Sequence, residues 1–530
     1  MSNLFGTDGI RGRVVLDECD DAGALQRIVE QRLLTPQLMK LLGEALGRCL
    51  PEGGEGNQIV IGWDNRPHNE TLAAWLTLGF HASNCTVVHI GCASTPMLHY
   101  AVLETNSRMG CMITASHNPV EDSGIKVFDA RGRKSMPDYE NLVSSMAYSL
   151  SEEERTIENE IRETGMHPDE RHNVDHQDWL QRRLSLVRPL FQHEFSLSNP
   201  LRLDCSKGHA STWLSTWLEQ QGLSVEEVSN KAKAMNDDCG AGELSPGQAW
   251  SWSEIKTSEH LLIQSLESQG VGAVVGAALD GDGDRCLLVR ETDTGVEVVD
   301  GDDIADALLQ ACPQAWKVAA SIESNLKLLS NIHQHPQMQG FETAVGDRWL
   351  SHALETHLAD QKQQPLLFGI EDSGHLVFPS PHPHTAEKWS LVGDGAMTLL
   401  LSLLAFGNVE SKPMEKGWKK RLSVKNPNRW MWDGRNALSN TVESMVRTHL
   451  EQAGTVVDWV RGGLPGESNL MLVRCNFNGM DMSFGLRNSG TQEKTSISLR
   501  FSQPDPGFDA MLLMRSVQNL LLRTFNPVSY

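Results

Sequence analysis

The predicted fold follows from three apolar runs: QIVIGWD at residues 58–64, CTVVHIG at residues 85–91 and MGCMIT at residues 109–114. Short apolar runs that end in polar residues are typical of buried β-strands. Residues 70–83 have the length and pattern of a helix, and Thr95-Pro96 marks the start of another helix before the third run. This order of strands and helices predicts a parallel sheet with helices on its faces.

The same alternation of strands and helices occurs twice more along the chain. Further strand-like runs lie at residues 201–205, 271–279, 318–322 and 366–369, and helical segments cover residues 211–221 and 394–406. After residue 411 the pattern changes to alternating strands, at residues 473–477 and 496–501, which favours a smaller α+β domain. We therefore predict an α/β protein of four domains. The expected boundaries are residues 1–160, 161–298, 299–420 and 421–530.

The charge of the chain argues against two classes of partner. Among its 530 residues, 46 are Lys or Arg and 68 are Asp or Glu, so the formal net charge is −22. Because such an acidic surface repels phosphate backbones and anionic lipids, we expect no nucleic-acid partner and no membrane partner. An anionic substrate would have to bind in a local basic pocket.

Several features favour a cytoplasmic protein. The first residues contain neither the basic region nor the apolar region of a secretory signal. The longest apolar run, residues 397–406, is too short to cross a bilayer and is expected to form a buried helix. The ten cysteines show no C-x-x-C or zinc-type spacing, so we expect reduced thiols, with Cys111, Cys205 and Cys286 in the core.

The hexapeptide TASHNP at residues 114–119 follows the third predicted strand. Ligands bind at the carboxyl ends of strands in open parallel sheets, so Ser116 beside His117 could act there as a nucleophile or phosphate carrier. Ser, Asn and Pro are also common in turns and helix caps, and the hexapeptide alone leaves both interpretations open. A hydrolase motif of the form G-x-S-x-G is absent from the sequence.

The hexapeptide DGDGDR at residues 280–285 also follows an apolar run. Its carboxylates, Asp280, Asp282 and Asp284, alternate with glycines and can converge on one hard cation such as Mg²⁺. An EF-hand is a poor fit, because Arg285 stands where the sharp turn needs glycine and the flank is strand-like. A solvated turn is the alternative, although three crowded carboxylates are costly without a cation.

Three more loops carry polar side chains. GIEDSGH at residues 369–375 offers donors and acceptors for a polyhydroxylated ligand, and RNSGTQEK at residues 487–494 combines cations, hydroxyls and glycine as a phosphate cradle does. FGTDGIRG at residues 5–12 is rich in glycine but does not match a dinucleotide-binding fingerprint. Taken singly, each of these loops could equally be an ordinary polar loop.

Together and in chain order, the four loops TASHNP, DGDGDR, GIEDSGH and RNSGTQEK resemble those of the α-D-phosphohexomutase superfamily, and the resemblance runs from Phe5 to about Arg500. The resemblance implies four domains around a central cleft, of which three are similar α/β units with mixed sheets. It implies a phosphohexomutase, an isomerase that interconverts sugar 6-phosphates and sugar 1-phosphates through a phosphoserine. It further implies one Mg²⁺ per chain, a sugar 1,6-bisphosphate as intermediate and activator, a small-molecule sugar phosphate as partner, and a monomer or homodimer.

The resemblance also implies roles for individual residues. Ser116 matches the phosphoserine, and the implied magnesium ligands are Ser116, Asp280, Asp282 and Asp284. The other catalytic matches are His117 and Lys126 for proton transfer, Arg11 in the cleft, and Arg285 for steadying the phosphoserine loop. The substrate-binding matches are Glu371, Ser373 and His375 for sugar hydroxyls, Arg487, Ser489, Thr491 and Lys494 for the non-reacting phosphate, and Arg348 as a further cation.

Within the superfamily, three segments resemble phosphoglucosamine mutases and favour glucosamine phosphate as the substrate: residues 5–12, 324–326 and 343–348. Other positions depart from that pattern, namely Ser123, Asp372, Asn488 and Gln492-Glu493. Asp372 could meet a substrate ammonium group or point to solvent. The altered phosphate loop leaves open a lower activity or a catalytically silent sugar-phosphate-binding protein. A phosphomannomutase or phosphoglucomutase of the same family and a phosphatase are further alternatives.

Overall fold

The computed structural model describes residues 3–51, 56–153, 169–192, 194–195, 197, 199–358, 362–407, 413–488 and 494–525. The chain divides into two compact units. Unit 1 comprises Met1–Cys312, Glu355–Leu367 and Ser373–Ser411, and unit 2 comprises Pro313–Leu354, Phe368–Asp372 and Lys412–Tyr530. The described residues form four sheets with helices, which confirms the α/β class. The four domain boundaries expected from the sequence stay a prediction.

The first sheet belongs to unit 1 and has seven strands in the order β2-β1-β6-β5-β3-β4-β7. Its strands are β1 (Ile10–Val14), β2 (Leu33–Leu34), β3 (Gln58–Trp63), β4 (Thr86–Cys92), β5 (Met109–Ile113), β6 (Asp122–Asp129) and β7 (Glu170–Arg171). Strand β3 is parallel to β4 and β5, as predicted, whereas β6 is antiparallel to both β5 and β1, so the sheet is mixed. The accompanying helices are α1 (Asp21–Gln26), α2 (Pro36–Arg48), α3 (Asn69–Ala82), α4 (Thr95–Glu104) and α5 (Pro137–Glu152), with a π-helical turn at Arg27–Gln31.

The second sheet also belongs to unit 1, with the order β10-β13-β12-β11-β8-β9. Its strands are β8 (Leu201–Asp204), β9 (Val225–Glu227), β10 (Ala249–Ser251), β11 (Val274–Leu279), β12 (Cys286–Glu291) and β13 (Gly295–Val299). The helices in this part of the chain are α6 (His176–Val187), α7 (Leu214–Gln220), α8 (Trp252–Ile255), α9 (Leu261–Gln264) and α10 (Gly301–Ala311). The DGDGDR loop joins the antiparallel strands β11 and β12, so it is not an EF-hand.

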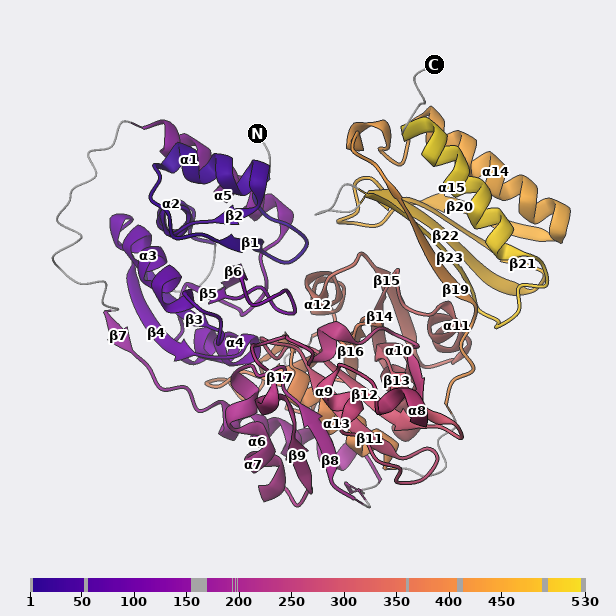
Figure 1. Cartoon of the computed structure of the whole chain (residues 1–530), viewed down its shortest axis with the longest axis horizontal. Helices are drawn as coiled ribbons and strands as arrows, with labels where there is room; N and C mark the ends of the chain where they lie inside the picture. Colours follow the sequence, from indigo (N-terminus) through magenta and orange to yellow (C-terminus); the bar gives the residue numbers. More distant parts are fainter. Residues whose placement is uncertain are drawn as a thin grey trace. The chain divides into compact units, whose positions relative to one another are not determined.

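The third sheet has the order β15-β14-β16-β17-β18, and the fourth has the order β19-β23-β22-β21-β20. The strands of the third are β14 (Lys317–Ser321), β15 (Gln339–Thr343), β16 (Leu367–Ile370), β17 (Leu376–Pro381) and β18 (Trp389–Gly393), with helices α11 (Leu326–Gln334), α12 (Asp347–Glu355) and α13 (Gly395–Phe406). The strands of the fourth are β19 (Lys419–Lys425), β20 (Val456–Gly462), β21 (Met471–Phe477), β22 (Met480–Asn488) and β23 (Lys494–Phe501). Its helices, α14 (Ala437–Ala453) and α15 (Ala510–Phe525), lie side by side along one face of this antiparallel sheet (Figure 1).

Local backbone chemistry explains where the predicted elements begin and end. Helix α4 starts at Thr95 because the Ser94 hydroxyl accepts a hydrogen bond from the Met97 N–H and proline is favourable in the first turn. Strand β11 starts at Val274 rather than at residue 271, because Gly270 and Gly272 have positive φ angles and form a turn. The helix predicted at residues 211–221 is broken at Trp213, which separates a 3₁₀ turn from α7.

The apolar helix of the sequence analysis is confirmed as a buried element. Helix α13 is buried at every position from Gly395 to Ala405, because its apolar residues cover all of its faces. All ten cysteines are free, and Cys111, Cys205 and Cys286 are fully buried, as predicted. In the part of the chain that the structure describes, no helix has both the length and the apolar character needed to cross a bilayer.

Candidate active site

Ser116 lies in the loop that follows strand β5, and its side chain is fully buried. Its φ of 54° lies in the left-handed region, which non-glycine residues rarely adopt and which is found preferentially at functional sites. The Ser116 hydroxyl donates a hydrogen bond to Asp280 Oδ2 at 2.7 Å, and its oxygen lies 3.4 Å from His117 Nδ1. Two loops that are 164 residues apart in the sequence therefore meet at this serine.

Two side chains that the sequence analysis missed hold the Ser116 loop. Arg66 Nη2 donates to the carbonyl oxygens of Ser116 at 2.7 Å and Asn118 at 2.8 Å. Asn236 Nδ2 donates to the same two oxygens, at 2.8 and 2.9 Å. The position of Arg66 just after strand β3 is a signal that could have identified it, because strand ends carry site residues. Asn236 lies in a loop whose sequence shows no such signal.

Replacing Arg66 by alanine is expected to lower the free energy of unfolding by about 3–5 kcal/mol, the usual cost of breaking a buried ion pair. The Arg66 and Asp64 side chains are fully buried and lie 3.2 Å apart, so the variant leaves a buried carboxylate without its cation. Urea unfolding of the variant and the wild-type protein measures this loss. A loss below about 1 kcal/mol, the scale of an exposed pair, would contradict it.

The loss in the Arg66 variant should depend on pH. Burial, opposed in part by Arg66, raises the pKa of Asp64 to about 6 in the wild-type protein, and removing the cation raises it further. A group with a raised pKa in the folded state destabilises it progressively as the pH rises through the interval between the unfolded and folded values. The loss should therefore be larger at about pH 8 than at about pH 5.5, where Asp64 can take up a proton.

The three aspartates of the DGDGDR loop form a buried cluster. Asp280, Asp282 and Asp284 each offer a carboxylate oxygen, and these three oxygens lie within 4.8 Å of one another. None of the three residues is more than 1% exposed. Among the described residues, Asp282 Oδ1 has no hydrogen-bond partner. Buried carboxylate oxygens with an unsatisfied acceptor suit a hard divalent cation, so the cluster fits Mg²⁺.

Cationic side chains surround the aspartate cluster. Lys126 Nζ lies 2.7 Å from Asp282 Oδ2, 2.9 Å from Asp284 Oδ2 and 3.0 Å from Asp8 Oδ2. Lys134 Nζ lies 3.0 Å from Asp8 Oδ1 and 3.4 Å from Asp284 Oδ2. Burial lowers the pKa of Lys126, but these carboxylates raise it more, and the net pKa is well above its ordinary value. Lys126 therefore keeps its proton in this arrangement. The sequence analysis missed Asp8 and Lys134.

Two arginines predicted from the sequence lie beside the same loops. Arg11 donates to the Ala115 carbonyl and to Asn118 Oδ1, both at 3.3 Å, and pairs with Asp8 at 2.7 Å. Arg285 Nε lies 3.7 Å from Asp280 Oδ2. The charge of Arg285, followed by burial and by the charge of Arg11, lowers the pKa of His117 to about 3. The His117 imidazole is therefore neutral at pH 7.

Asp280 is held differently from its two neighbours. Its Oδ1 accepts hydrogen bonds from the backbone N–H groups of Asp284 and Arg285, at 3.1 and 3.2 Å. Burial, followed by the charges of Asp284 and Asp282, raises the pKa of Asp280 to about 7. A bound cation would remove this penalty by favouring the ionised carboxylate, which is a second reason why the cluster fits a metal.

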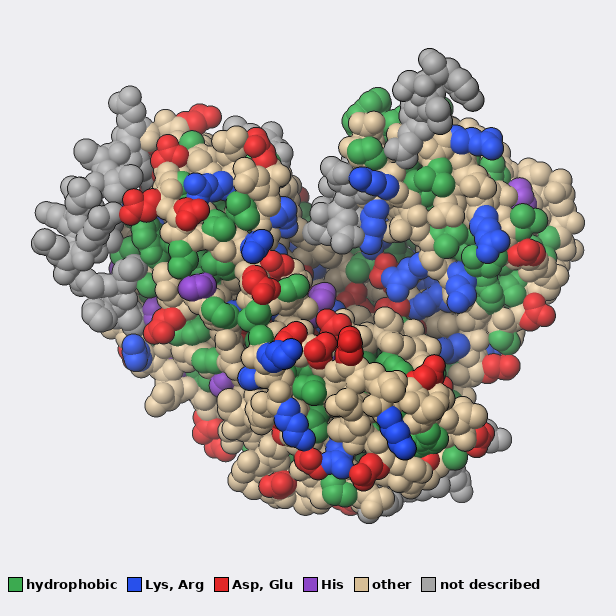
Figure 2. Space-filling view, in the orientation of Figure 1, with side chains coloured by type: hydrophobic (Ala, Val, Ile, Leu, Met, Phe, Trp, Pro, Cys, Tyr) green, Lys and Arg blue, Asp and Glu red, His purple; other side chains and the backbone are tan. Residues whose placement is uncertain are grey.

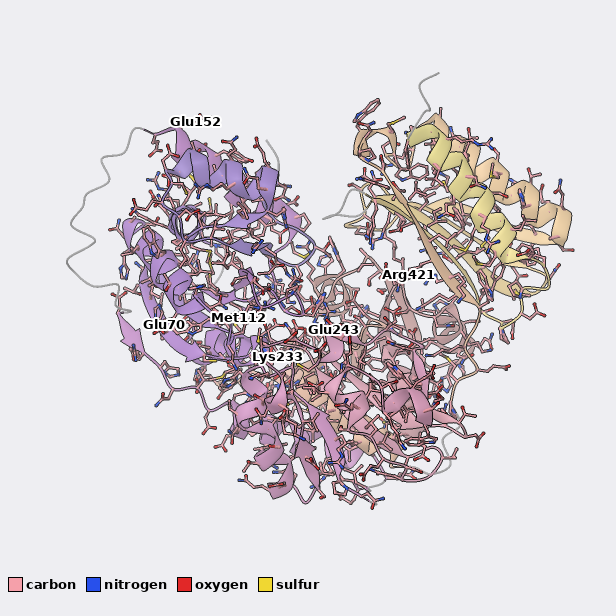
Figure 3. The ribbon with its side chains drawn as sticks, in the orientation of Figure 1. Glu70, Met112, Glu152, Lys233, Glu243 and Arg421 are labelled. Carbon is pink, nitrogen blue, oxygen red and sulfur yellow. The ribbon has the colours of Figure 1, made fainter. Side chains whose placement is uncertain are left out.

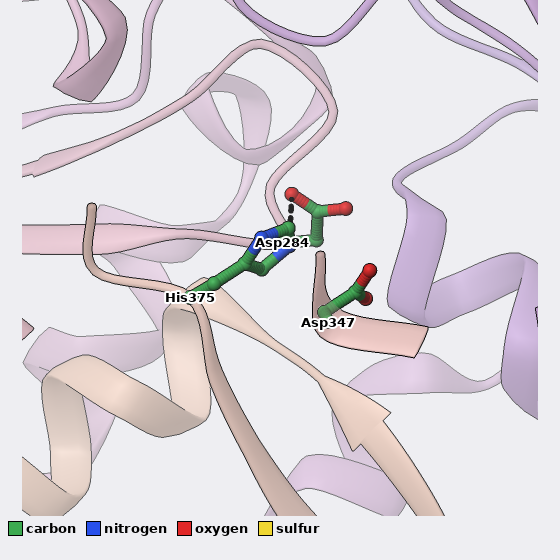
Figure 4. Close-up of side chains that lie close together, drawn as sticks. All are labelled: Asp284, Asp347 and His375. Atoms are coloured by element: carbon green, nitrogen blue, oxygen red, sulfur yellow. Dashed lines mark ion pairs between the residues drawn. The ribbon is translucent and has the colours of Figure 1, made fainter. Parts of the chain in front are cut away.

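The structure brings part of the third loop to the cluster. His375 Nε2 lies 2.9 Å from Asp284 Oδ1, as the dashed line in Figure 4 marks. Gly374 has a φ of 85°, and a Cβ atom there would lie 2.3 Å from the Cys286 carbonyl oxygen. Only glycine allows the loop to approach strand β12 this closely, which places His375 beside Asp284. Ser373 belongs to the same unit and is half-buried.

Glu371 and Asp372 belong to unit 2. Glu371 is buried and accepts a hydrogen bond from the Gly346 N–H at 2.8 Å. The Asp372 carboxylate does not point to solvent, which corrects one of the two alternatives, because its side chain is 5% exposed and lies 2.7 Å from Lys419 Nζ and 3.5 Å from Arg421 Nη2. Its charge is therefore compensated by two cations of strand β19.

The predicted phosphate-binding residues also belong to unit 2. Arg487 ends strand β22 with Asn488, and the half-buried Lys494 begins β23. Arg348 is half-buried, with its guanidinium carbon 5.7 Å from the centre of the Trp349 ring. Asn488 donates to the Trp432 carbonyl at 2.8 Å and accepts from Thr495 Oγ1 at 2.7 Å, so it fixes the base of the loop. Ser489 and Thr491 lie outside the described residues.

Comparison with known proteins identifies the family. Models of phosphoglucomutase/phosphomannomutase, alpha/beta/alpha domain I and domain III, match residues 2–154 and 301–422. A phosphoglucosamine mutase from Corynebacterium jeikeium (strain K411) is 30% identical over 428 residues, which are 78% of this chain and 81% of that protein. The chain belongs to the phosphoglucomutase/phosphomannomutase family. It is a phosphohexomutase, an isomerase that moves a phosphoryl group between two positions of a sugar phosphate.

A second curated relative agrees with this assignment, and solved structures share the fold. A phosphoglucosamine mutase from Anoxybacillus flavithermus (strain DSM 21510 / WK1) is 26% identical over 460 residues, or 85% of this chain and 89% of that protein. The fold matches a phosphoglucomutase/phosphomannomutase family protein from Burkholderia thailandensis with a TM-score of 0.62 and 17% identity, over 100% of this chain and 98% of that one. It also matches an N-acetylphosphoglucosamine mutase from Aspergillus fumigatus, solved with GlcNAc-6P and magnesium, with a TM-score of 0.56 and 14% identity, over 99% and 96% of the chains.

Proposed function

We propose that this phosphohexomutase interconverts glucosamine 6-phosphate and glucosamine 1-phosphate, with Ser116 as the phosphoryl carrier. The observation that carries this proposal is the 2.7 Å contact between the buried Ser116 hydroxyl and Asp280, within a cluster of three carboxylates. The choice of sugar is supported by the three segments that resemble phosphoglucosamine mutases and by the curated relatives of that name.

In the proposed reaction, a sugar hydroxyl attacks the phosphorus atom of phosphorylated Ser116. The bond between phosphorus and Ser116 Oγ breaks as the new bond to the sugar oxygen forms. The hydroxyl proton passes to His117 and then to Ser116 Oγ, the leaving oxygen, 3.4 Å from His117 Nδ1. The sugar 1,6-bisphosphate then returns its other phosphoryl group to Ser116 by the reverse steps, which releases the isomer and restores the carrier.

Of the two residues predicted for proton transfer, His117 suits the base and Lys126 suits a counter-ion. His117 is neutral at pH 7 because Arg285 and burial lower its pKa, and a phosphoryl group on the neighbouring Ser116 would raise that pKa by its negative charge. Lys126 already carries a proton that three carboxylates stabilise. A fixed ammonium group can neutralise charge that develops on a transferring phosphoryl group.

The residues that would hold a magnesium ion are Asp280, Asp282 and Asp284, together with the phosphorylated Ser116. When bound, Mg²⁺ supplies a Lewis acid that draws charge from the phosphoryl group. Arg66 and Asn236 keep the Ser116 loop in place through its carbonyl groups, so that the carrier need not reorganise during transfer. Arg11 and Arg285 add positive charge beside the same loop.

We assign recognition of the substrate to the remaining predicted residues. The proposed contacts to sugar hydroxyls are Glu371, Ser373 and His375, and the proposed contacts to the non-reacting phosphate are Arg487, Ser489, Thr491 and Lys494, with Arg348 as a further cation. Guanidinium and ammonium groups suit phosphate by charge and by hydrogen bonding. A cytoplasmic location and a monomeric or homodimeric state remain predictions from the sequence.

A panel of substrates tests the choice of sugar. With Mg²⁺ and a sugar 1,6-bisphosphate supplied, kcat/KM for glucosamine 6-phosphate should exceed that for glucose 6-phosphate and mannose 6-phosphate by at least about tenfold, within the range that contacts to one substituent give. A higher kcat/KM for glucose or mannose phosphate would overturn the glucosamine assignment but leave the mutase in place.

One observation favours a second candidate, a phosphoglucomutase or phosphomannomutase reaction. Asp372 is paired with Lys419 and Arg421, so its compensated charge offers little attraction to a substrate ammonium group. A neutral hydroxyl in place of the amine would suit such a loop equally well. The same panel decides between the two candidates.

A further inference from the structure

Arg487 is already bound by two carboxylates of its own unit. Its Nη2 lies 3.1 Å from Glu323 Oε1, and its Nη1 lies 3.4 Å from Glu467 Oε1. Glu323 lies in the loop after strand β14, whereas Glu467 lies in the loop between β20 and β21. Both ends of the guanidinium fork are thus engaged by anionic side chains.

Glu323 is held on its other side by strand β19. Arg421 Nη1 lies 2.5 Å from Glu323 Oε2, and Lys419 Nζ donates to the Glu323 carbonyl at 2.6 Å. Burial raises the pKa of Glu323, but Arg421 and Arg487 lower it more, so Glu323 stays ionised at neutral pH. Figure 3 labels Arg421, and Figure 2 shows Lys and Arg side chains gathered in the same part of unit 2.

A carboxylate and a phosphate group bind a guanidinium group through the same interactions. Both accept paired N–H donors from the planar fork, and both are attracted by its charge. A phosphate that approaches Arg487 must therefore either displace a carboxylate or bind beside it. Binding beside it brings two anions close together, which weakens the binding by like-charge repulsion.

We propose that Glu323, assisted by Glu467, acts as an internal anion that occupies Arg487 and thereby weakens its binding of phosphate. The inference rests on the proposed role of Arg487 in holding the non-reacting phosphate. Weak binding of phosphate at Arg487 has a function in a mutase. The phosphate group of the bisphosphate that is held there has to leave Arg487 before the bisphosphate can turn and present that group to Ser116. Glu323 then sets the phosphate affinity without being a catalytic residue.

Glu323→Gln tests the proposal, because it removes the charge and keeps the size and hydrogen-bonding capacity of the side chain. We expect the Kd for inorganic phosphate and for glucosamine 6-phosphate, measured by calorimetry at low ionic strength, to fall about tenfold, with a parallel fall in KM. Glu467→Gln should change both constants in the same direction. An unchanged or raised Kd in both variants would overturn the proposal.

The chain offers a matched control for the loss of charge. Glu443 has the same 22% side-chain exposure as Glu323 and also pairs with an arginine of unit 2, Arg461, at 2.6 Å. Glu443→Gln should leave both constants unchanged, and an equal fall in this variant would show that net charge alone is responsible.

Arg487→Ala separates this inference from the proposed function. If Kd rises in Arg487→Ala while Glu323→Gln and Glu467→Gln leave it unchanged, Arg487 binds phosphate and only the internal-anion proposal fails. If Kd is unchanged in Arg487→Ala, Arg487 does not bind phosphate, and the proposed role of Arg487 fails together with this inference.

Discussion

Replacing Ser116 by alanine is expected to lower the mutase kcat by more than about 10⁴-fold, as removal of a covalent carrier does in other enzymes. The variant has no oxygen to which a phosphoryl group can be attached, and no other described hydroxyl donates a hydrogen bond to Asp280. Glucosamine 6-phosphate turnover measures the loss. Intact-mass analysis after incubation with a sugar 1,6-bisphosphate should show the added phosphoryl group in the wild-type protein and not in the variant.

The protein contains a closely matched control for this substitution. Ser206 is also fully buried, has a φ of 55° and uses its hydroxyl for one hydrogen bond, to the Leu279 carbonyl at 3.1 Å. Ser206→Ala should stay within a few-fold of wild-type activity, because it loses a hydrogen bond worth about 1 kcal/mol and no reacting atom. Wild-type turnover in Ser116→Ala would refute the role of Ser116 as carrier.

The second large effect is expected at the aspartate cluster. Asp282→Asn should lower kcat about 10³-fold, because it removes one of three carboxylates that would hold the cation and leaves the charge on the phosphoryl group less stabilised. The variant should also lose a property that does not depend on turnover. Added Mg²⁺ should raise the Tm of the wild-type protein, because a ligand that binds only the folded state stabilises it, and should leave the Tm of Asp282→Asn unchanged.

Asp306 provides the control for the loss of a buried negative charge in unit 1. It is 8% exposed, lies in helix α10 and is hydrogen-bonded to Gln310, away from the aspartate cluster in the sequence. Asp306→Asn should keep the Mg²⁺-dependent rise in Tm and most of the activity. Equal Mg²⁺ responses in Asp282→Asn and in the wild-type protein would exclude the three aspartates as the metal site.

The strands were predictable because their patterns are local. The runs at residues 58–64, 85–91 and 109–114 became strands β3, β4 and β5, since apolar side chains bounded by polar residues are buried most easily in the middle of a sheet. The alternation of strands and helices did not predict that β6 pairs antiparallel with β5. The direction of pairing depends on the connection between the two strands.

The site was predictable only in part. Ser116 and the three aspartates could be selected from the sequence by their residue type and by their position after strands. Arg66 and Asn236 were not selected, because they bind backbone carbonyl groups, which any residue can offer. The pairing of Asp372 with Lys419 and Arg421 joins residues that are more than forty positions apart, and nothing in the GIEDSGH loop points to them. Contacts of this kind have no local sequence pattern.

The sequence alone determined the class of fold and the set of reactive groups. Apolar periodicity indicates the strands and helices, and the order of four polar loops indicates the chemistry. The tertiary structure decided the state of those groups. Three carboxylates raise the pKa of Lys126 above its ordinary value despite burial, whereas Arg285 and burial lower the pKa of His117. The physical reason is that protonation depends on the distance to other charges and to water, and folding determines both.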